Sequence, residues 1–269
     1  MGRWHGRLDF YSCLRWNVCC PVLGAAIDPV RIKIVTPLSE TSIPPVAAMV
    51  HHCCDLLHQR IECTQKLSGL VVGCGNGNEV VYMRHTFRYE HLVGVDVEET
   101  FSLEARAEQC VIRGDALHLP FPSGTFDFAA AFHSLEHVVD AKVALSEIRR
   151  VLRPGAWFYV GVPNSRRLVG YLGSFDATTW QKVTWNLTDW LARVRRKFKN
   201  EYGAHAGFER RELIELLRER FVDVQLLTED FLRYKYAGFL PRGVLRLLLA
   251  HSIIDHTAPA HYAICQKQP

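Results

Sequence analysis

The stretch "LVVGCGNGNEVV", residues 70–81, decides the fold class of this chain. An apolar run at 70–72 leads into Gly73, Gly75 and Gly77, the pattern of a strand that turns sharply into a helix. Glycines there let a ligand approach the backbone, and the amides that open the helix face that ligand. A dinucleotide site would show GxGxxG, but Asn78 stands in place of the third glycine. The spacing favours a nucleoside without a pyrophosphate, and an ordinary tight turn is the alternative.

Apolar strands and helices alternate on both sides of this loop. Continuous apolar runs separated by helices are typical of a parallel sheet that is covered on both faces. The sequence therefore predicts an α/β fold with a doubly wound, mostly parallel, Rossmann-like sheet. The strands are expected near 68–73, 91–97, 110–115, 125–132, 156–163, 222–229 and 260–267, and the helices near 44–61, 78–87, 102–109, 140–152 and 210–221.

Two acidic residues follow later strands of the expected sheet. Asp96 ends the strand "HLVGVD" about twenty residues beyond the glycines, where a carboxylate can accept hydrogen bonds from both ribose hydroxyls. A helix N-cap is the alternative role for Asp96. Asp115 ends the next strand and could accept the exocyclic amine of adenine beside the amide of Ala116. A bare loop, a ribose acceptor and an adenine acceptor together predict an adenosine pocket.

Four collinear motifs extend this pattern: "VVGCGNGNE", "GVD", "GDALHLPFPSGTFDFAAAFHSLEHVVD" and "ALSEIRRVLRPGAWFYVGVPN". In order and spacing they resemble class I S-adenosylmethionine-dependent methyltransferases, in particular the quinone and small-molecule methyltransferase group. The resemblance covers roughly residues 66–165. It implies a seven-stranded sheet with a reversed final hairpin, S-adenosyl-L-methionine as cofactor, and glycines along its methionine moiety. The cofactor residues expected in this way are Gly73, Cys74, Gly75, Gly77, Asp96, Val97, Asp115, Ala116, Phe132 and His133.

The segment "FHSLEHVVD" supplies the candidate catalytic residues. His133 is expected nearest the transferred methyl group and is the preferred general base for a hydroxyl acceptor, with His137 as the second candidate. In the alternative reading, Glu136 and His137 only shape the loop. A divalent ion held by Glu136 and the two histidines is a minority hypothesis, and we expect no metal. Cys74 is expected to be a packing residue rather than a nucleophile.

The sequence predicts methyl transfer to a small, hydroxyl-bearing and partly apolar acceptor. Alternatives are a non-catalytic methyltransferase-fold partner protein, and methylation of a protein, an RNA, or a nitrogen or carbon atom. A nicotinamide oxidoreductase is disfavoured by Asn78 and Asp115. The Asn/Asp-Pro-Pro signature of amino methyltransferases is missing, since "AFHS" stands in its place. No nucleic-acid partner is expected, because a net charge of +4 is too small to indicate one.

An N-terminal arm and two insertions are expected to accompany a single domain. Residues 1–45 are interpreted as an N-terminal arm and 46–269 as one methyltransferase domain, with lid insertions at about 164–205 and 231–257. The first insertion has a helical stripe that we expect to pack on the domain. Contact with a membrane or a lipid-like acceptor is the alternative, since basic residues accompany the stripe. The stripe consists of Val183, Leu187, Leu191, Val194 and Phe198.

Composition and cysteine content fit an ordinary globular enzyme. The chain has 269 residues, of which 48% are hydrophobic, and no apolar run reaches the roughly 18 residues that a membrane span needs. Nine cysteines, an odd number scattered through apolar runs, do not suggest a disulfide framework. We therefore expect a cytoplasmic protein, with peripheral contact to a membrane as a further expectation.

Overall fold

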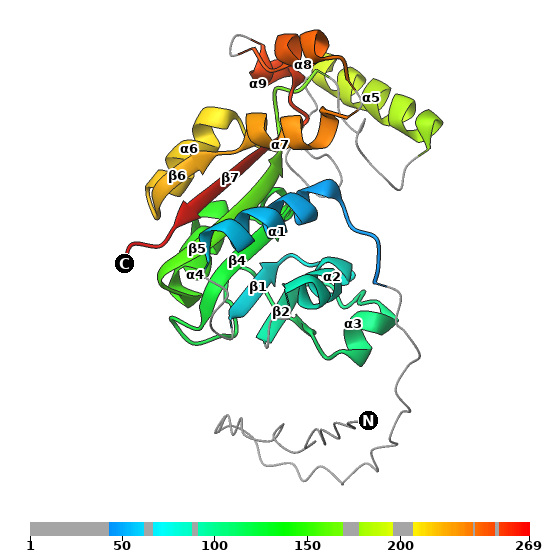
Figure 1. Ribbon diagram of the computed structural model, residues 1–269. Coiled ribbons are helices and arrows are strands. Elements are labelled where there is room, and N and C mark those ends of the chain that lie inside the picture. The colour runs from blue at the N-terminus through cyan, green and yellow to red at the C-terminus, as the bar shows by residue number, and fades with distance from the viewer. Residues whose placement is uncertain are drawn as a thin grey trace, which may run out of the picture. The chain divides into compact units, whose positions relative to one another are not determined.

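A computed structural model describes residues 43–61, 67–87, 91–168, 178–195, 207–238, 240–250 and 253–269. All of these lie in one compact unit, Thr41–Pro269. Most of the expected N-terminal arm, Phe198 and the basic residues at 196–199 therefore lie outside the described residues. In Figure 1 the elements are labelled in chain order.

The strands form a seven-stranded sheet in the order β3-β2-β1-β4-β5-β7-β6. β1 to β5 run parallel, and β7 is antiparallel to both β5 and β6. The predicted doubly wound sheet with a reversed final hairpin is thus confirmed. The strands are β1 (Ser68–Val72), β2 (His91–Asp96), β3 (Val111–Arg113), β4 (Phe126–Phe132), β5 (Leu152–Pro163), β6 (Val222–Leu226) and β7 (Ala260–Gln266).

Helices cover the sheet and extend its carboxyl edge. They are α1 (Ala48–Arg60), α2 (Asn78–Phe87), α3 (Leu103–Ala107), the short 3₁₀ helix η1 (Leu135–His137), α4 (Ala141–Val151), α5 (Thr179–Val194), α6 (Arg210–Arg218), α7 (Thr228–Tyr236), α8 (Arg242–Leu248) and α9 (Ile254–Thr257). The second expected insertion, 231–257, contains most of α7 and all of α8 and α9. None of the helices in the described part of the chain is long and apolar enough to cross a membrane.

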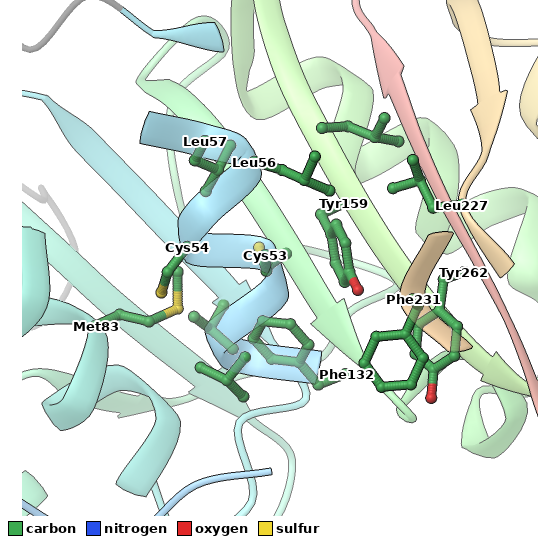
Figure 2. Packing of buried hydrophobic residues seen from close by; sticks show 14 of the residues in the cluster. Cys53, Cys54, Leu56, Leu57, Met83, Phe132, Tyr159, Leu227, Phe231 and Tyr262 are labelled. Carbon is green, nitrogen blue, oxygen red and sulfur yellow. The ribbon is translucent and has the colours of Figure 1, made fainter. Parts of the chain in front are cut away.

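Two hydrophobic clusters hold the sheet between its helices, one on each face. Side chains alternate between the faces of a strand. On β5, Tyr159 therefore packs in one cluster and Phe158 in the other. Figure 2 shows the first cluster, where Cys53 of α1 lies near Tyr159 and Phe231 of α7 packs on Tyr262 of β7. Covering both faces explains why the central strands read as unbroken apolar runs.

Helix α4 shows how directly the local sequence determines an element. Asp140 caps its N-terminus by accepting hydrogen bonds from the amides of Lys142 and Val143. Its buried residues recur at helical spacing, and the helix ends at Val151, one residue before the expected end at 152. The strand expected to reach residue 229 stops at Leu226 instead, because α7 begins at Thr228.

One buried histidine makes stability depend on pH. His261 of β7 is 1% exposed, and neither ring nitrogen has a hydrogen-bond partner among the described residues. Burial lowers the pKa of its imidazole to about 4 from an ordinary 6.5. Below pH 6.5 the imidazole of His261 is protonated in the unfolded chain, whereas in the folded chain it stays neutral until about pH 4. Acidification through this window should therefore cost on the order of 3 kcal/mol of folding free energy.

The variant His261→Gln tests this expectation, because glutamine is polar but does not titrate. Urea unfolding of both proteins at about pH 7.5 and about pH 5 gives the free energy of unfolding at each pH. The wild type should lose about 2 kcal/mol more than the variant on acidification. An equal loss in the two proteins would contradict the prediction.

Candidate functional site

A pocket of about 580 Å³ opens at the carboxyl ends of β1, β2 and β4. This edge is where ligands bind in open α/β sheets. Nine of the ten residues expected at the cofactor line the pocket, and so does His137. The exception is Gly77. The nine are Gly73, Cys74, Gly75, Asp96, Val97, Asp115, Ala116, Phe132 and His133.

Gly73 and Gly77 of the glycine loop lack a side chain for two different reasons. Gly73 has φ +69°, and a Cβ atom on it would overlap the Cβ of Ser134, whose hydroxyl donates to the carbonyl of Val72. Gly73 therefore lets the loop after β4 approach the loop after β1. Gly77 has φ +85°, and a Cβ there would lie 2.7 Å from Ala105 and Val111. Gly77 thus permits close packing beside the pocket rather than ligand contact.

Asp96 connects the end of β2 to the glycine loop. Its Oδ2 accepts a hydrogen bond from the Gly75 amide at 2.7 Å, and its Oδ1 accepts one from the Glu98 amide at 2.9 Å. Each carboxylate oxygen can accept a second hydrogen bond. The structural role and the expected ribose role of Asp96 are therefore compatible. The carboxylate is already oriented before any ligand arrives.

The adenine end of the expected site is more open. Asp115 is exposed, and its Oδ1 accepts a hydrogen bond from the amide of Leu117 at 2.9 Å. Val97, 54% exposed, and Leu117 supply apolar surface to the pocket lining. An aromatic ring could lie against these side chains while Asp115 accepts from its edge. Asp115 and Ala116 thus both line the pocket, and their contact with adenine stays a prediction.

Cys74 is buried beneath the glycine loop. Its Sγ would lie 2.7 Å from a Cβ atom on Gly94, so the thiol fills the space that this glycine leaves. Burial raises the pKa of the Cys74 thiol, and the nearby acids Asp96 and Glu79 raise it further. A thiol that resists ionisation is a poor nucleophile. This supports the interpretation of Cys74 as a packing residue.

Glu79 is a pocket residue that the sequence reasoning missed. It lies in the first turn of α2, directly behind the glycine loop, and lines the pocket. Burial raises the pKa of its carboxyl group. An acidic residue at a helix N-terminus is common for reasons of helix stability alone. Its position two residues after Gly77 was the one signal that could have suggested ligand contact.

His133 stands at the end of β4 in a strained backbone conformation. Its φ of +51° is unusual for a residue with a side chain, and its amide donates to the carbonyl of Gly161 at 2.9 Å. The imidazole is 32% exposed and lies edge-on to the ring of Tyr262. Such strain gathers at functional sites. The turn directs the imidazole toward the pocket.

Glu136 is a buried carboxylate between two imidazoles. Its side chain is 1% exposed, and neither oxygen has a hydrogen-bond partner among the residues that the structure describes. The Oε1 atom lies 3.7 Å from Nδ1 of His133 and 4.0 Å from Nε2 of His137. A buried carboxyl group without hydrogen bonds is costly, so Glu136 is an unusual feature of this loop. Within the described ranges, no three His, Cys, Asp or Glu side chains are grouped as a metal site requires.

The charges of the pocket indicate the kind of ligand that fits it. Carboxylates from Glu79, Asp96, Glu98 and Asp115 line it, and no lysine or arginine does among the described residues. A pyrophosphate would meet four acids and no basic side chain. S-adenosylmethionine suits the same lining, because its sulfonium and ammonium groups outweigh its one carboxylate and its adenosine is neutral. The residues present therefore fit this cofactor and argue against a dinucleotide.

Comparison with known proteins supports the same conclusion. Residues 70–160 match a family described as "Methyltransferase domain". The chain is 35% identical over 94 residues to a fatty-acid O-methyltransferase of Mycolicibacterium smegmatis, covering 33% of this chain and 34% of that protein. It is 38% identical over 96 residues to the O-methyltransferase resE of Aspergillus sclerotiorum, covering 32% and 36%. The chain thus matches about a third of the length of these curated relatives.

A solved structure shares the fold over a longer span. The CurJ carbon methyltransferase superposes with a TM-score of 0.51 at 15% identity, covering 82% of this chain and 54% of that one. At this identity the likeness concerns the fold alone. It agrees with the strand order and the reversed hairpin described above.

Proposed function

We propose that this chain, which contains a class I S-adenosylmethionine-dependent methyltransferase domain, transfers a methyl group to an oxygen of a small, partly apolar, hydroxyl-bearing acceptor. The observation that carries the proposal is the pocket itself, lined by acids without lysine or arginine among the described residues and bordered by His133. The match of residues 70–160 and the O-methyltransferase relatives support it. Identification of the acceptor requires direct assay, since fold alone does not specify substrate.

When bound, S-adenosylmethionine supplies an activated methyl group on a sulfonium. The chain's part is to hold an acceptor oxygen in line with that methyl and to remove its proton. Positioning of this kind can contribute several kcal/mol to catalysis. His133 lies where the strand end meets the pocket, so its imidazole would accept the hydroxyl proton. Glu136, 3.7 Å away, would stabilise the imidazolium that results.

The acceptor's apolar character is supported by the other side of the pocket. Four apolar residues line this part of the pocket: the buried Phe132 and Leu135, the partly buried Val138, and Val139, which is 97% exposed. Exposed apolar residues beside a site are typical of ligand contact. One relative is named for a fatty acid, which is an apolar acceptor with a reactive oxygen. Apolar alcohols, phenols and fatty acids are therefore the first acceptors to assay.

The cofactor site is tested with Asp96→Ala. We expect wild-type protein to bind S-adenosylmethionine in calorimetric titration, and the variant to bind at least about tenfold more weakly, or 1.4 kcal/mol. The reason is that alanine removes both the ribose acceptor and the hydrogen bond to Gly75. Glu99→Ala is the matched control, because Glu99 is an exposed acid that does not line the pocket. Equal affinities of the wild type and Asp96→Ala would contradict the assignment.

Turnover separates a catalyst from a non-catalytic partner protein. The wild type is incubated with S-adenosylmethionine and the three acceptor classes, and S-adenosylhomocysteine is measured. Acceptor-dependent release supports the proposal. Cofactor binding without release for any of the three classes would favour the non-catalytic alternative.

A further inference from the structure

Helix α5, in the segment between β5 and α6, has no buried residue along its 16 positions. It is nonetheless a well-defined helix, with a capping box formed by Thr178 and Gln181. An ion pair between the buried Arg167 and the partly buried Asp189, 2.7 Å apart, connects it to the rest of the unit. The indole of Trp190 also donates to the carbonyl of Leu168. The helix is therefore held in place by polar contacts.

The orientation of α5 is inverted with respect to an ordinary surface helix. At 100° per residue, six of its exposed large apolar side chains fall within a stripe about 100° wide. Asp189 and the partly buried Lys182, Asn186 and Arg193 lie on the opposite side. The expectation that the apolar stripe packs on the domain is wrong, because that stripe faces outward. In the structure the exposed stripe also includes two tryptophans, so it consists of Trp180, Val183, Leu187, Trp190, Leu191 and Val194.

Exposed basic side chains near the apolar stripe come from Arg195 and from α8, whereas Lys182 and Arg193 lie on the opposite side of α5. Residues 178–199 contain six lysines and arginines and one acid, Asp189, which is paired with Arg167. Helix α8 repeats this combination, with exposed Val244 and Leu247 beside exposed Arg242 and Arg246. Hydrogen bonds connect the two helices through Leu168 and α9. Figure 1 shows α5, α8 and α9 together at one end of the described unit.

The apolar stripe and the basic residues near it fit the surface of a bilayer. An amphipathic helix with tryptophan on its apolar side and basic residues beside it lies in the interface of a bilayer, where tryptophan is enriched. Anionic headgroups attract each nearby lysine or arginine by about 1 kcal/mol. A second copy of the chain fits less well, since pairing α5 with α5 would bring two strongly basic segments together.

We propose that α5, through the stripe Trp180 to Val194, docks this chain on an anionic phospholipid membrane. The segment that contains α5 leaves β5 at the carboxyl edge of the sheet, the same edge at which the pocket opens. An apolar acceptor dissolved in the membrane would therefore be delivered near the pocket. That last step rests on the proposed methyl transfer, whereas the docking itself does not.

Vesicle co-sedimentation tests the docking with the full chain and no substrate. Vesicles of phosphatidylcholine with about 30% phosphatidylserine are compared with vesicles of phosphatidylcholine alone. We expect the wild type to bind the anionic vesicles at least about tenfold more strongly than the neutral ones, and less as salt rises. Leu187→Glu should lower binding to anionic vesicles at least about tenfold, because it places a charge in the stripe. Leu103→Glu is the matched control, since Leu103 is 81% exposed on α3.

Two results would overturn the docking proposal. One is a wild type that does not sediment with anionic vesicles at low salt. The other is equal sedimentation of Leu187→Glu and Leu103→Glu. A dimer in size-exclusion chromatography that Leu187→Glu dissociates, without vesicle binding, would assign the stripe to a second copy. Calorimetry with S-adenosylmethionine is run on the same variants. Because α5 does not line the pocket, these variants should bind the cofactor as the wild type does, whatever the result with vesicles.

Discussion

Gly73→Ala should abolish binding of S-adenosylmethionine and lower the free energy of unfolding by roughly 3–5 kcal/mol. The new Cβ would overlap that of Ser134, and its Oγ would lie 2.7 Å away, so the loop after β4 must move. The φ of +69° adds roughly 1–2 kcal/mol of backbone strain. Because Ser134 follows His133, displacing it also displaces the proposed base. Urea unfolding and calorimetric titration measure the two effects.

Gly75→Ala is the matched control for this prediction. Gly75 also has a positive φ, of +52°, but a Cβ atom there would meet nothing within 4 Å. Gly75→Ala should therefore lower the free energy of unfolding only through backbone strain, by roughly 1–2 kcal/mol. The double variant Gly73→Ala, Ser134→Gly removes the overlapping Cβ and should recover part of the stability. If Gly73→Ala and Gly75→Ala lose equal stability, contact with Ser134 is not the reason for Gly73.

His133→Asn should lower kcat by about a hundredfold and change the affinity for S-adenosylmethionine by less than about threefold. Asparagine tolerates a positive φ better than most residues, so it keeps the turn that His133 makes at φ +51°. It removes the imidazole that would accept the acceptor's proton. The rate is measured as S-adenosylhomocysteine released with an alcohol or phenol that the wild type turns over, because a fatty acid is already ionised at neutral pH and has no proton to remove. An unchanged rate would exclude His133 as the general base.

Glu136→Gln tests whether Glu136 contributes to catalysis or only to stability. The carboxylate is buried without hydrogen bonds in the described structure, so removing its charge should leave the protein as stable or more stable. The rate should nevertheless fall, by about tenfold, because the imidazolium of His133 loses a neighbouring negative charge. A purely structural role would instead predict lost stability with an unchanged rate. His137→Asn, compared with His133→Asn, shows which imidazole receives the proton.

Most of the cofactor pocket could be predicted because its residues follow strands directly. A parallel sheet brings the carboxyl ends of its strands to one edge, so Gly73, Asp96, Asp115 and His133 had to gather once the strands were recognised. Glu79 and the packing role of Gly77 could not be predicted in this way. The role of Gly77 depends on how it lies against α3 and β3, which are contacts between elements that no local pattern reports.

Hydrophobic periodicity and glycine placement act over a few residues, so they predicted the sheet, the helices α1 to α6 and the positions of Asp96 and Asp115. They did not predict α7, α8 and α9. The direction in which the apolar stripe of α5 faces depends instead on contacts between elements. The pattern of that helix is amphipathic in either orientation. The ion pair of Arg167 with Asp189, residues 22 positions apart, draws its polar side inward. The spacing of Glu136 placed it beside two histidines, but its burial without a hydrogen bond among the described residues became visible only in the structure.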